Sequence, residues 1–304
     1  MVWIVQGVGV AVLVAVAPWM WGIAQTVKAR CQGRRGPAPG QLYWIIRKHW
    51  HKETTVPDRS SWVFRLAPSV SMASLVLIVI TIPIAGRVPP EWPHNMLTLF
   101  FLLALERFWS GLAGLDTGGT FGGLGASRIT TLGTGIEPAL FAALGIAWQV
   151  SGDGAIVPLA AHLTNGSASL LPWALASVSV ALVLLAEWGR LPVDNPDTHL
   201  ELTMMHEATL LEYDGRFLAL SEWAMALKFT ALVAFAWVVL GPQFSSLWAN
   251  LGLRIVEMAA TAGALGWLES RLTKLRYFQL PAYFAVAAGI GMLGFYLASG
   301  GLGL

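Results

Sequence analysis

Acidic and imidazole side chains gather in one stretch of the sequence, residues 187–222. Seven carboxylates fall between Glu187 and Asp214, with two histidines among them, and strongly apolar segments flank the stretch on both sides. The whole chain is 56% hydrophobic and only 12% charged, so its acid is concentrated here. Carboxylates and imidazoles can exchange protons and can face a complementary protein surface. We therefore expect a surface where protons are loaded and a partner protein docks, made of Asp194, Asp197, His199, Glu201, His206, Glu207, Glu212 and Asp214.

The residue types around this stretch do not favour a metal or a nucleotide. His206-Glu207 lacks the second histidine of a zinc protease helix, and His199-Leu200-Glu201 lacks the paired cysteines of a zinc deaminase. The single cysteine, Cys31, excludes an internal disulfide and a cysteine-ligated iron–sulfur cluster carried by this chain alone. The glycine-rich residues 111–128 contain no Gly-Lys-Ser/Thr and follow no strand pattern. Close helix packing or a flexible turn explains these glycines better than a phosphate cradle.

The composition indicates a polytopic membrane protein, because a soluble domain with a mean hydropathy of +0.62 would expose large apolar patches. Spans of about 20 apolar residues must be helical, since lipid offers no partner to bare backbone groups. The sequence thus predicts an all-α fold, and we treat residues 1–304 as a single membrane domain. The first segment is expected to be retained as a span. The eight predicted spans are roughly 2–25, 66–86, 96–115, 128–150, 170–189, 217–240, 246–268 and 279–300.

Lysine and arginine residues predict the orientation. They concentrate in the segment 28–65 and after the third, fifth and seventh spans, whereas loops on the opposite side hold only Arg87. The positive-inside rule places the basic loop 28–65 and the acidic loop 187–216 in the cytoplasm and both termini outside. Within the basic loop, the mixture of aromatic, apolar and basic residues at 42–50 suits an amphipathic helix in the membrane interface or a protein-docking surface. Asn195-Pro196 predicts a short helix that runs to about Leu211.

Several charged residues fall where lipid is expected. Each costs on the order of 2.5–3.5 kcal/mol near mid-bilayer, so such groups usually face a protein interior or a water-filled path. Glu137 lies nine residues beyond Arg128, roughly 13 Å deeper along a helix, with no adjacent cation in sequence. Desolvation should favour its protonated form and let it exchange protons near neutral pH; a structural ion pair with an arginine of another span is the alternative.

The other charged residues in the spans are simpler to interpret. Arg254 and Glu257 stand three residues apart and should neutralise each other. Glu106 and Arg107 point to different sides of one helix, so each needs its own partner. Glu187 closes the fifth span, where water should be near. The candidate ion path therefore comprises Glu106, Arg128, Glu137, Glu187, Arg190, Glu222 and Lys228.

Four motifs carry a resemblance to a known family. They are RRGPAPGQ (34–41), LDTGGTFGGLGASR (115–128), Arg128 with Glu137 nine residues on, and AEWGRLPVDNPDTHLEL (186–202) through EYDGR (212–216). The chain resembles the membrane subunit shared by respiratory complex I, where it lies at the quinone site, and the group 4 membrane-bound nickel–iron hydrogenases. The formate hydrogenlyase subunit 4 branch is the most similar. His199 in place of a third loop carboxylate and the longer segment before Glu212 favour the hydrogenase branch.

The resemblance implies a function and a setting. It implies a non-catalytic, ion-translocating anchor in the inner membrane of a prokaryote, with Glu137 and Glu187 on a charged path. The chain would hold no cofactor, and partner subunits would carry the nickel–iron centre and the iron–sulfur clusters. The implied partners are a hydrophilic hydrogenase or complex I-like arm, antiporter-like membrane subunits and membrane lipid, and no nucleic acid. A quinone-chamber subunit and a stand-alone secondary transporter are the alternatives.

Overall fold

The computed structural model describes residues 2–86, 92–151, 154–156, 170–194 and 205–299. Within these residues, eight helices are long and apolar enough to cross a membrane, which confirms the predicted all-α fold and its eight spans. Two short helices, α2 (Gln41–Trp50) and α8 (His206–Leu210), and the 3₁₀ turn η1 (Tyr277–Gln279) complete the elements. The long helices are α1 (Val2–Cys31), α3 (Trp62–Thr81), α4 (Met96–Asp116), α5 (Thr120–Ser151), α7 (Leu170–Glu187), α9 (Gly215–Leu240), α10 (Leu247–Glu269) and α11 (Leu280–Ala298).

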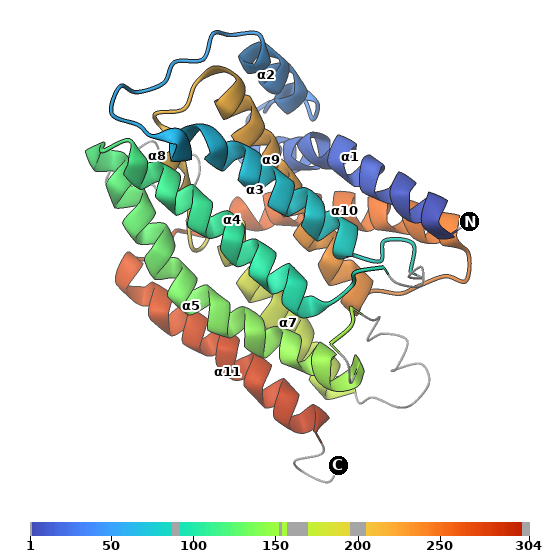
Figure 1. Ribbon diagram of the computed structural model, residues 1–304. Helices are drawn as coiled ribbons and strands as arrows, with labels where there is room; N and C mark the ends of the chain where they lie inside the picture. The colour runs from blue at the N-terminus through green and yellow to red at the C-terminus, as the bar shows by residue number, and fades with distance from the viewer. Residues whose placement is uncertain (1, 87–91, 152–153, 157–169, 195–204, 300–304) are drawn as a thin grey trace.

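The helices form one bundle (Figure 1), and α9 is its most buried span. In its most apolar part, α9 is 72% buried, more than any other span, and apart from Lys228 the residues buried there are mostly apolar or small. Helices α1, α2 and α3 pack against α9, while α5 and α11 lie side by side along their length. A single hydrophobic cluster draws residues from all eight long helices. Burial of apolar surface within the bundle therefore holds the charged groups described below in fixed positions.

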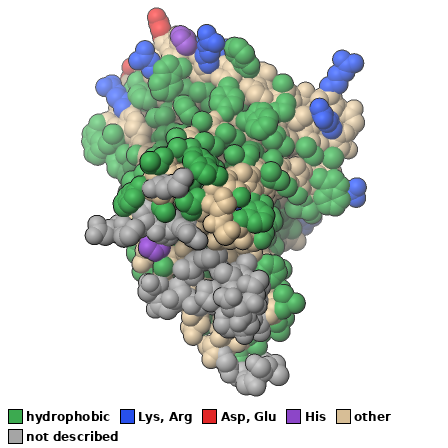
Figure 2. Space-filling view, turned by 90° about the vertical axis from the view of Figure 1, so that its right-hand side faces the viewer, with side chains coloured by type: hydrophobic (Ala, Val, Ile, Leu, Met, Phe, Trp, Pro, Cys, Tyr) green, Lys and Arg blue, Asp and Glu red, His purple; other side chains and the backbone are tan. Residues whose placement is uncertain are grey.

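Because successive long helices run in opposite directions, four of their connections lie at one end of the bundle, which we call the basic end. These are the connections after α1, α4, α7 and α10, and they include the basic loop and the acidic loop. Figure 2 shows hydrophobic side chains covering much of the upper part of one face of the molecule, with Lys and Arg side chains along its upper and right-hand edges. That the basic end faces the cytoplasm stays a prediction from its Lys and Arg residues.

Helix boundaries differ from the predicted spans mainly at the basic end, where helices extend beyond the apolar runs. Helix α3 begins at Trp62 because the Ser61 hydroxyl accepts a hydrogen bond from the Val63 amide at 3.1 Å, an N-cap. Helix α5 begins at Thr120 rather than near residue 128, so the glycine-rich segment is largely helical. Its glycines permit close packing: a Cβ on Gly122 would lie 2.5 Å from the Gly114 carbonyl oxygen of α4. The flexible-turn interpretation of this segment is therefore wrong for its helical part.

The predicted helix between the first and second spans is confirmed as α2. Only Ile46 is buried in it, while Trp44 is 65% exposed and basic residues occupy its last turn. Of the predicted helix in the acidic loop, the structure shows α8. Residues 195–204, with the candidate residues Asp197, His199 and Glu201, lie outside the described residues.

Candidate functional site

Arg107 of α4 joins charged residues from two other spans. Its Nη1 donates to Glu137 Oε1 of α5 at 2.7 Å, and its Nη2 donates to Glu187 Oε1 of α7 at 2.5 Å. Gly133 of α5 provides room for the guanidinium, because a Cβ there would lie 3.2 Å from Nη1. Glu137 therefore forms an ion pair with an arginine of another span, which was the alternative expectation for this residue. Proton exchange is compatible with this pair, because part of the Glu137 side chain is exposed.

Lys228 of α9 extends the same group of charges. Its Nζ lies 2.8 Å from Glu106 Oε2 and 3.8 Å from Glu187 Oε2. Glu106 and Arg107 thus have separate partners, as expected for neighbouring residues that point to different sides of one helix. Glu187 bridges the two cations. We call the five residues Glu106, Arg107, Glu137, Glu187 and Lys228 the Arg107 cluster.

Exposure varies within the Arg107 cluster. The side chain of Glu187 is 1% exposed, which corrects the expectation that water is near it at the end of its span. Arg107, Lys228 and Glu106 are nearly as buried, whereas the side chain of Glu137 is 41% exposed. Glu137 opens into a cleft of about 540 Å³, lined also by Phe100, Phe141 and Phe295. The cluster therefore has a closed centre and one carboxylate that reaches the exposed surface beside α5.

A second opening connects the Arg107 cluster with α8 of the acidic loop. A small cavity of about 70 Å³ is lined by Glu106, Arg107 and Lys228 of the cluster and by His206 of α8. Hydroxyl groups of serine and threonine complete much of its polar wall: Ser71, Ser110, Thr209 and Ser221. A polar space of this size has room for water and for the partners that water needs.

Asp194 and His206 connect α8 to the loops beside it. Asp194 Oδ1 accepts a hydrogen bond from Lys274 Nζ at 2.7 Å, and Oδ2 lies 3.5 Å from His206 Nδ1. Burial raises the pKa of Asp194, but the hydrogen bonds and charges of His206 and Lys274 outweigh it, so the pKa lies below its ordinary value. The sequence marks Lys274 only as a basic loop residue, and no local pattern pairs it with Asp194.

Arg190 lies in a different cluster from the predicted path residues Glu106, Glu137, Glu187 and Lys228. Its Nη1 donates to both carboxylate oxygens of Glu269 at 3.2 Å, and its guanidinium lies 3.7 Å from the ring centre of Trp21. Lys28 Nζ lies 3.2 Å from the same carboxylate. We call Lys28, Arg190 and Glu269 the Arg190 cluster. Sequence reasoning missed Glu269; the available signal was its position as the last residue of a span whose second half is otherwise uncharged.

Two further residues of the predicted path lie apart from the Arg107 cluster. Arg128 is nine residues before Glu137 on α5, about 13 Å along the axis. Glu222 is six residues before Lys228 on α9; its Oε2 is buried and accepts no hydrogen bond from the described residues. Repulsion from the Glu207 carboxylate acts on Glu222.

The remaining residues of the predicted docking surface lie near the start of α9. Asp214 accepts a hydrogen bond from the Gly215 amide at 2.7 Å, which gives it a capping role. Glu212 is exposed beside Gly119, where an added Cβ would lie 3.4 Å from Oε1.

Comparison with known proteins identifies the family of this chain. The NADH dehydrogenase family matches residues 4–297. The chain belongs to this family. Formate hydrogenlyase subunit 4 of Escherichia coli is 32% identical over 294 residues, which cover 93% of this chain and 94% of that protein. Hydrogenase-4 component C of the same organism is 35% identical over 71% of this chain and 68% of that protein.

More distant relatives agree with the fold. A subunit of the NADH-quinone oxidoreductase of Syntrophotalea carbinolica is 24% identical over 94% of this chain and 92% of that protein. A chain in the structure of the membrane-bound sulfane sulfur reductase, an archaeal respiratory membrane complex, superimposes with a TM-score of 0.85. The superposition covers 98% of this chain and 99% of that chain at 19% identity, so it supports the fold alone. The resemblance that the motifs carry is confirmed. This chain is a multi-pass membrane protein.

Proposed function

We propose that this chain is the membrane-anchor and ion-translocating subunit of a complex I-like oxidoreductase of the formate hydrogenlyase or group 4 nickel–iron hydrogenase type. Similarity to formate hydrogenlyase subunit 4 and to hydrogenase-4 component C supports the type of complex. The observation that carries ion translocation is the Arg107 cluster itself, which links four spans and borders a polar cavity. Ionisable groups inside spans usually mark ion or proton pathways.

The charge balance of the Arg107 cluster favours proton exchange. Three carboxylates face two cations, so the cluster carries a formal charge of −1 when all five groups are ionised. An uncompensated charge is costly in a low-dielectric interior, whereas one bound proton makes the cluster neutral. A nearby charge change in a partner subunit would shift the proton affinity of these coupled groups. The cluster can therefore take up a proton and release it again as its partner is reduced and oxidised.

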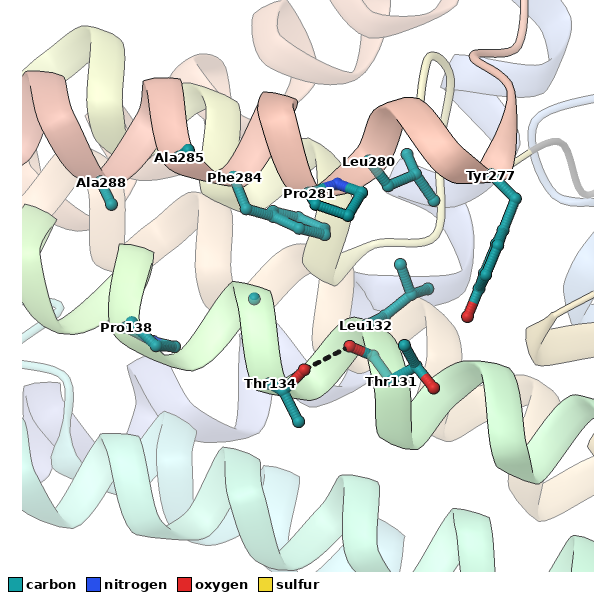
Figure 3. Close-up of a pocket in the computed structure, with 11 residues that line it drawn as sticks. Thr131, Leu132, Thr134, Pro138, Tyr277, Leu280, Pro281, Phe284, Ala285 and Ala288 are labelled. Carbon is teal, nitrogen blue, oxygen red and sulfur yellow. Dashed lines mark hydrogen bonds between the residues drawn. The ribbon is translucent and has the colours of Figure 1, made fainter.

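The exposed side of Glu137 indicates where a membrane partner docks. A carboxylate facing lipid costs on the order of 2.5–3.5 kcal/mol, so another subunit is needed to cover it. The surface beside it, between α5 and α11, forms a further cleft of about 370 Å³ (Figure 3). Thr131 and Thr134 of α5 and the hydroxyl of Tyr277 line this cleft, whose remaining walls are mostly apolar. We assign this face to an antiporter-like membrane subunit that continues the ion path.

The acidic loop is the surface we assign to the hydrophilic arm. Within the described residues, no three His, Cys, Asp or Glu side chains are grouped to hold a metal ion. The electron-carrying centres, a nickel–iron site and iron–sulfur clusters, are assigned to the partner subunits. The complex is assigned to the inner membrane of a prokaryote, with the basic end of this chain in the cytoplasm and both termini outside.

Substitution of Glu137 tests the proposal. The Glu137→Gln variant of the intact complex should assemble and turn over electrons, but ion translocation into vesicles should fall by at least about tenfold, because proton transfer by a positioned group contributes 10²–10⁴-fold. Glu53→Gln, on the basic loop, is the matched control and should translocate normally. Translocation at the normal rate in Glu137→Gln would remove this residue from the path.

Quinone reduction by a complex that contains this chain is the second candidate, favoured by the similarity to the NADH-quinone oxidoreductase protein. The two functions separate in a redox assay of the purified complex with quinone analogues. Tight inhibition by such analogues supports the quinone function, and turnover insensitive to them supports the hydrogenase type.

A further inference from the structure

The expected point at which protons enter the Arg107 cluster is closed. Glu187 lies at the end of its span, but its side chain is 1% exposed and both of its oxygens face cations of the cluster. Among the ionisable residues in the wall of the 70 Å³ cavity, His206 has the most exposed side chain, at 29%. Glu106, Arg107 and Lys228 in the same wall are 12%, 9% and 10% exposed. His206 thus touches both the surface and the cavity.

Neighbouring groups fix the orientation of the His206 ring. Asp194 lies 3.5 Å from Nδ1 and is itself held by Lys274. The Asp194 carboxylate therefore faces Nδ1, and Nε2 is the ring nitrogen that does not face it. The backbone of Gly189 lies against the ring, since a Cβ there would be 2.6 Å from Nδ1. Gly189 also has a φ of +58°, a conformation that other residues rarely adopt. The ring is therefore held in place from two sides.

Charged groups surround His206 from several elements. The segment after α7 supplies Asp194, the loop after α10 supplies Lys274, and α7 supplies Glu187, whose charge interacts with the imidazole. The cavity wall adds Glu106 and Arg107 from α4 and Lys228 from α9, and Glu207 is the next residue on α8. The imidazole therefore lies between the Asp194 carboxylate and the charged groups of the Arg107 cluster.

We propose that His206 is the residue through which protons pass from the acidic loop into the Arg107 cluster, an inference that rests on the proposed function. Nε2 takes a proton from water at the surface, and the imidazolium gives a proton through water in the cavity to the carboxylate of Glu106 or Glu187. The ring returns to its neutral form, one carboxylate gains a proton, and no electron moves. Transfer by one positioned imidazole matches the general acid–base role of histidine near neutral pH.

The test uses the intact complex in sealed vesicles, with His206→Ala and His206→Gln variants and ion translocation followed during turnover. We expect a loss on the order of 10²-fold in both variants. Added imidazole should restore translocation in His206→Ala, because the removed ring leaves space beside the cavity, but not in His206→Gln. His94→Gln at the opposite end of the bundle should translocate normally.

Other results would overturn the inference. Normal translocation in His206→Ala would show that protons enter elsewhere, and a loss that imidazole does not restore would assign His206 a structural role. The Glu187→Gln variant separates failure of this inference from failure of the proposed function. If Glu187→Gln abolishes translocation while His206→Ala does not, only the role of His206 fails; if both translocate normally, the proposed function fails as well.

Discussion

Two buried arginines anchor two clusters that differ in what surrounds them. The Arg107 cluster borders a polar cavity and ends at Glu137, whose side chain is 41% exposed. In the Arg190 cluster, no side chain is more than 6% exposed, and Trp21 covers the guanidinium at 3.7 Å. These buried ion pairs join three parts of the chain: α1, α10 and the segment that follows α7. Their low exposure leaves water no route to the charged groups. The difference supports the proposal that the Arg107 cluster exchanges protons, and it suits the Arg190 cluster to fixing helices in place.

The largest effect should come from breaking the sealed cluster. Glu269→Gln removes the carboxylate that Arg190 and Lys28 share, and removal of one partner from a buried pair costs about 3–5 kcal/mol. We expect a strong fall in the thermal midpoint of the detergent-purified complex, or failure to assemble. A midpoint within experimental error of the wild type would show that the Arg190 cluster holds nothing together.

A smaller, pH-dependent effect is expected at Asp194, between the clusters and the surface. Its pKa is lowered in the folded protein, so its stabilising contribution is complete above the unfolded pKa of about 3.9 and is lost as the pH falls through the folded pKa. Asp194→Asn should therefore be less stable than the wild type by a constant amount from pH 8 to pH 5, with the difference shrinking below about pH 4. Thermal unfolding across this range is the measurement, and a difference that grows toward low pH would refute it.

The smallest effect should come from the ion pair that stands apart from both clusters. Arg254 and Glu257 lie 2.8 Å apart on one helix, as the sequence predicted, and Arg254 Nη2 also donates to the Pro242 carbonyl. Replacement of a buried pair by apolar residues of similar size is often neutral or stabilising. The double variant Arg254→Met/Glu257→Leu should assemble and translocate ions normally. Loss of translocation in the double variant would extend the ion path to α10.

The sequence predicted the spans well because lipid imposes their length and composition. It located the charged residues of α4, α5 and α9 for the same reason, since each charge interrupts an apolar run. Their partners could not be predicted, because Arg107, Glu137 and Glu187 meet only when three helices pack at one depth. Arg190 shows the same limit: proximity to Glu187 in sequence does not keep the two side chains together, and Arg190 turns instead toward Glu269. Its place on the ion path stays a prediction.

Helix ends were less predictable than spans. Helix α5 begins eight residues before the predicted start at residue 128, because its glycines fit against α4 and α8 instead of forming a turn. Packing of this kind depends on residues far apart in the sequence, such as Gly114 and Thr209, so no local pattern reveals it.

Glu187 offers the most direct test of the difference between the two clusters, because it bridges Arg107 and Lys228 at the closed centre of the cluster assigned to proton exchange. The measurement is the number of ions moved per electron pair by the intact complex in sealed vesicles, for the wild type and for Glu187→Gln. We predict that the variant assembles and turns over electrons but moves no ions. An unchanged ratio of ions to electrons in Glu187→Gln would contradict the assignment of the Arg107 cluster to ion translocation.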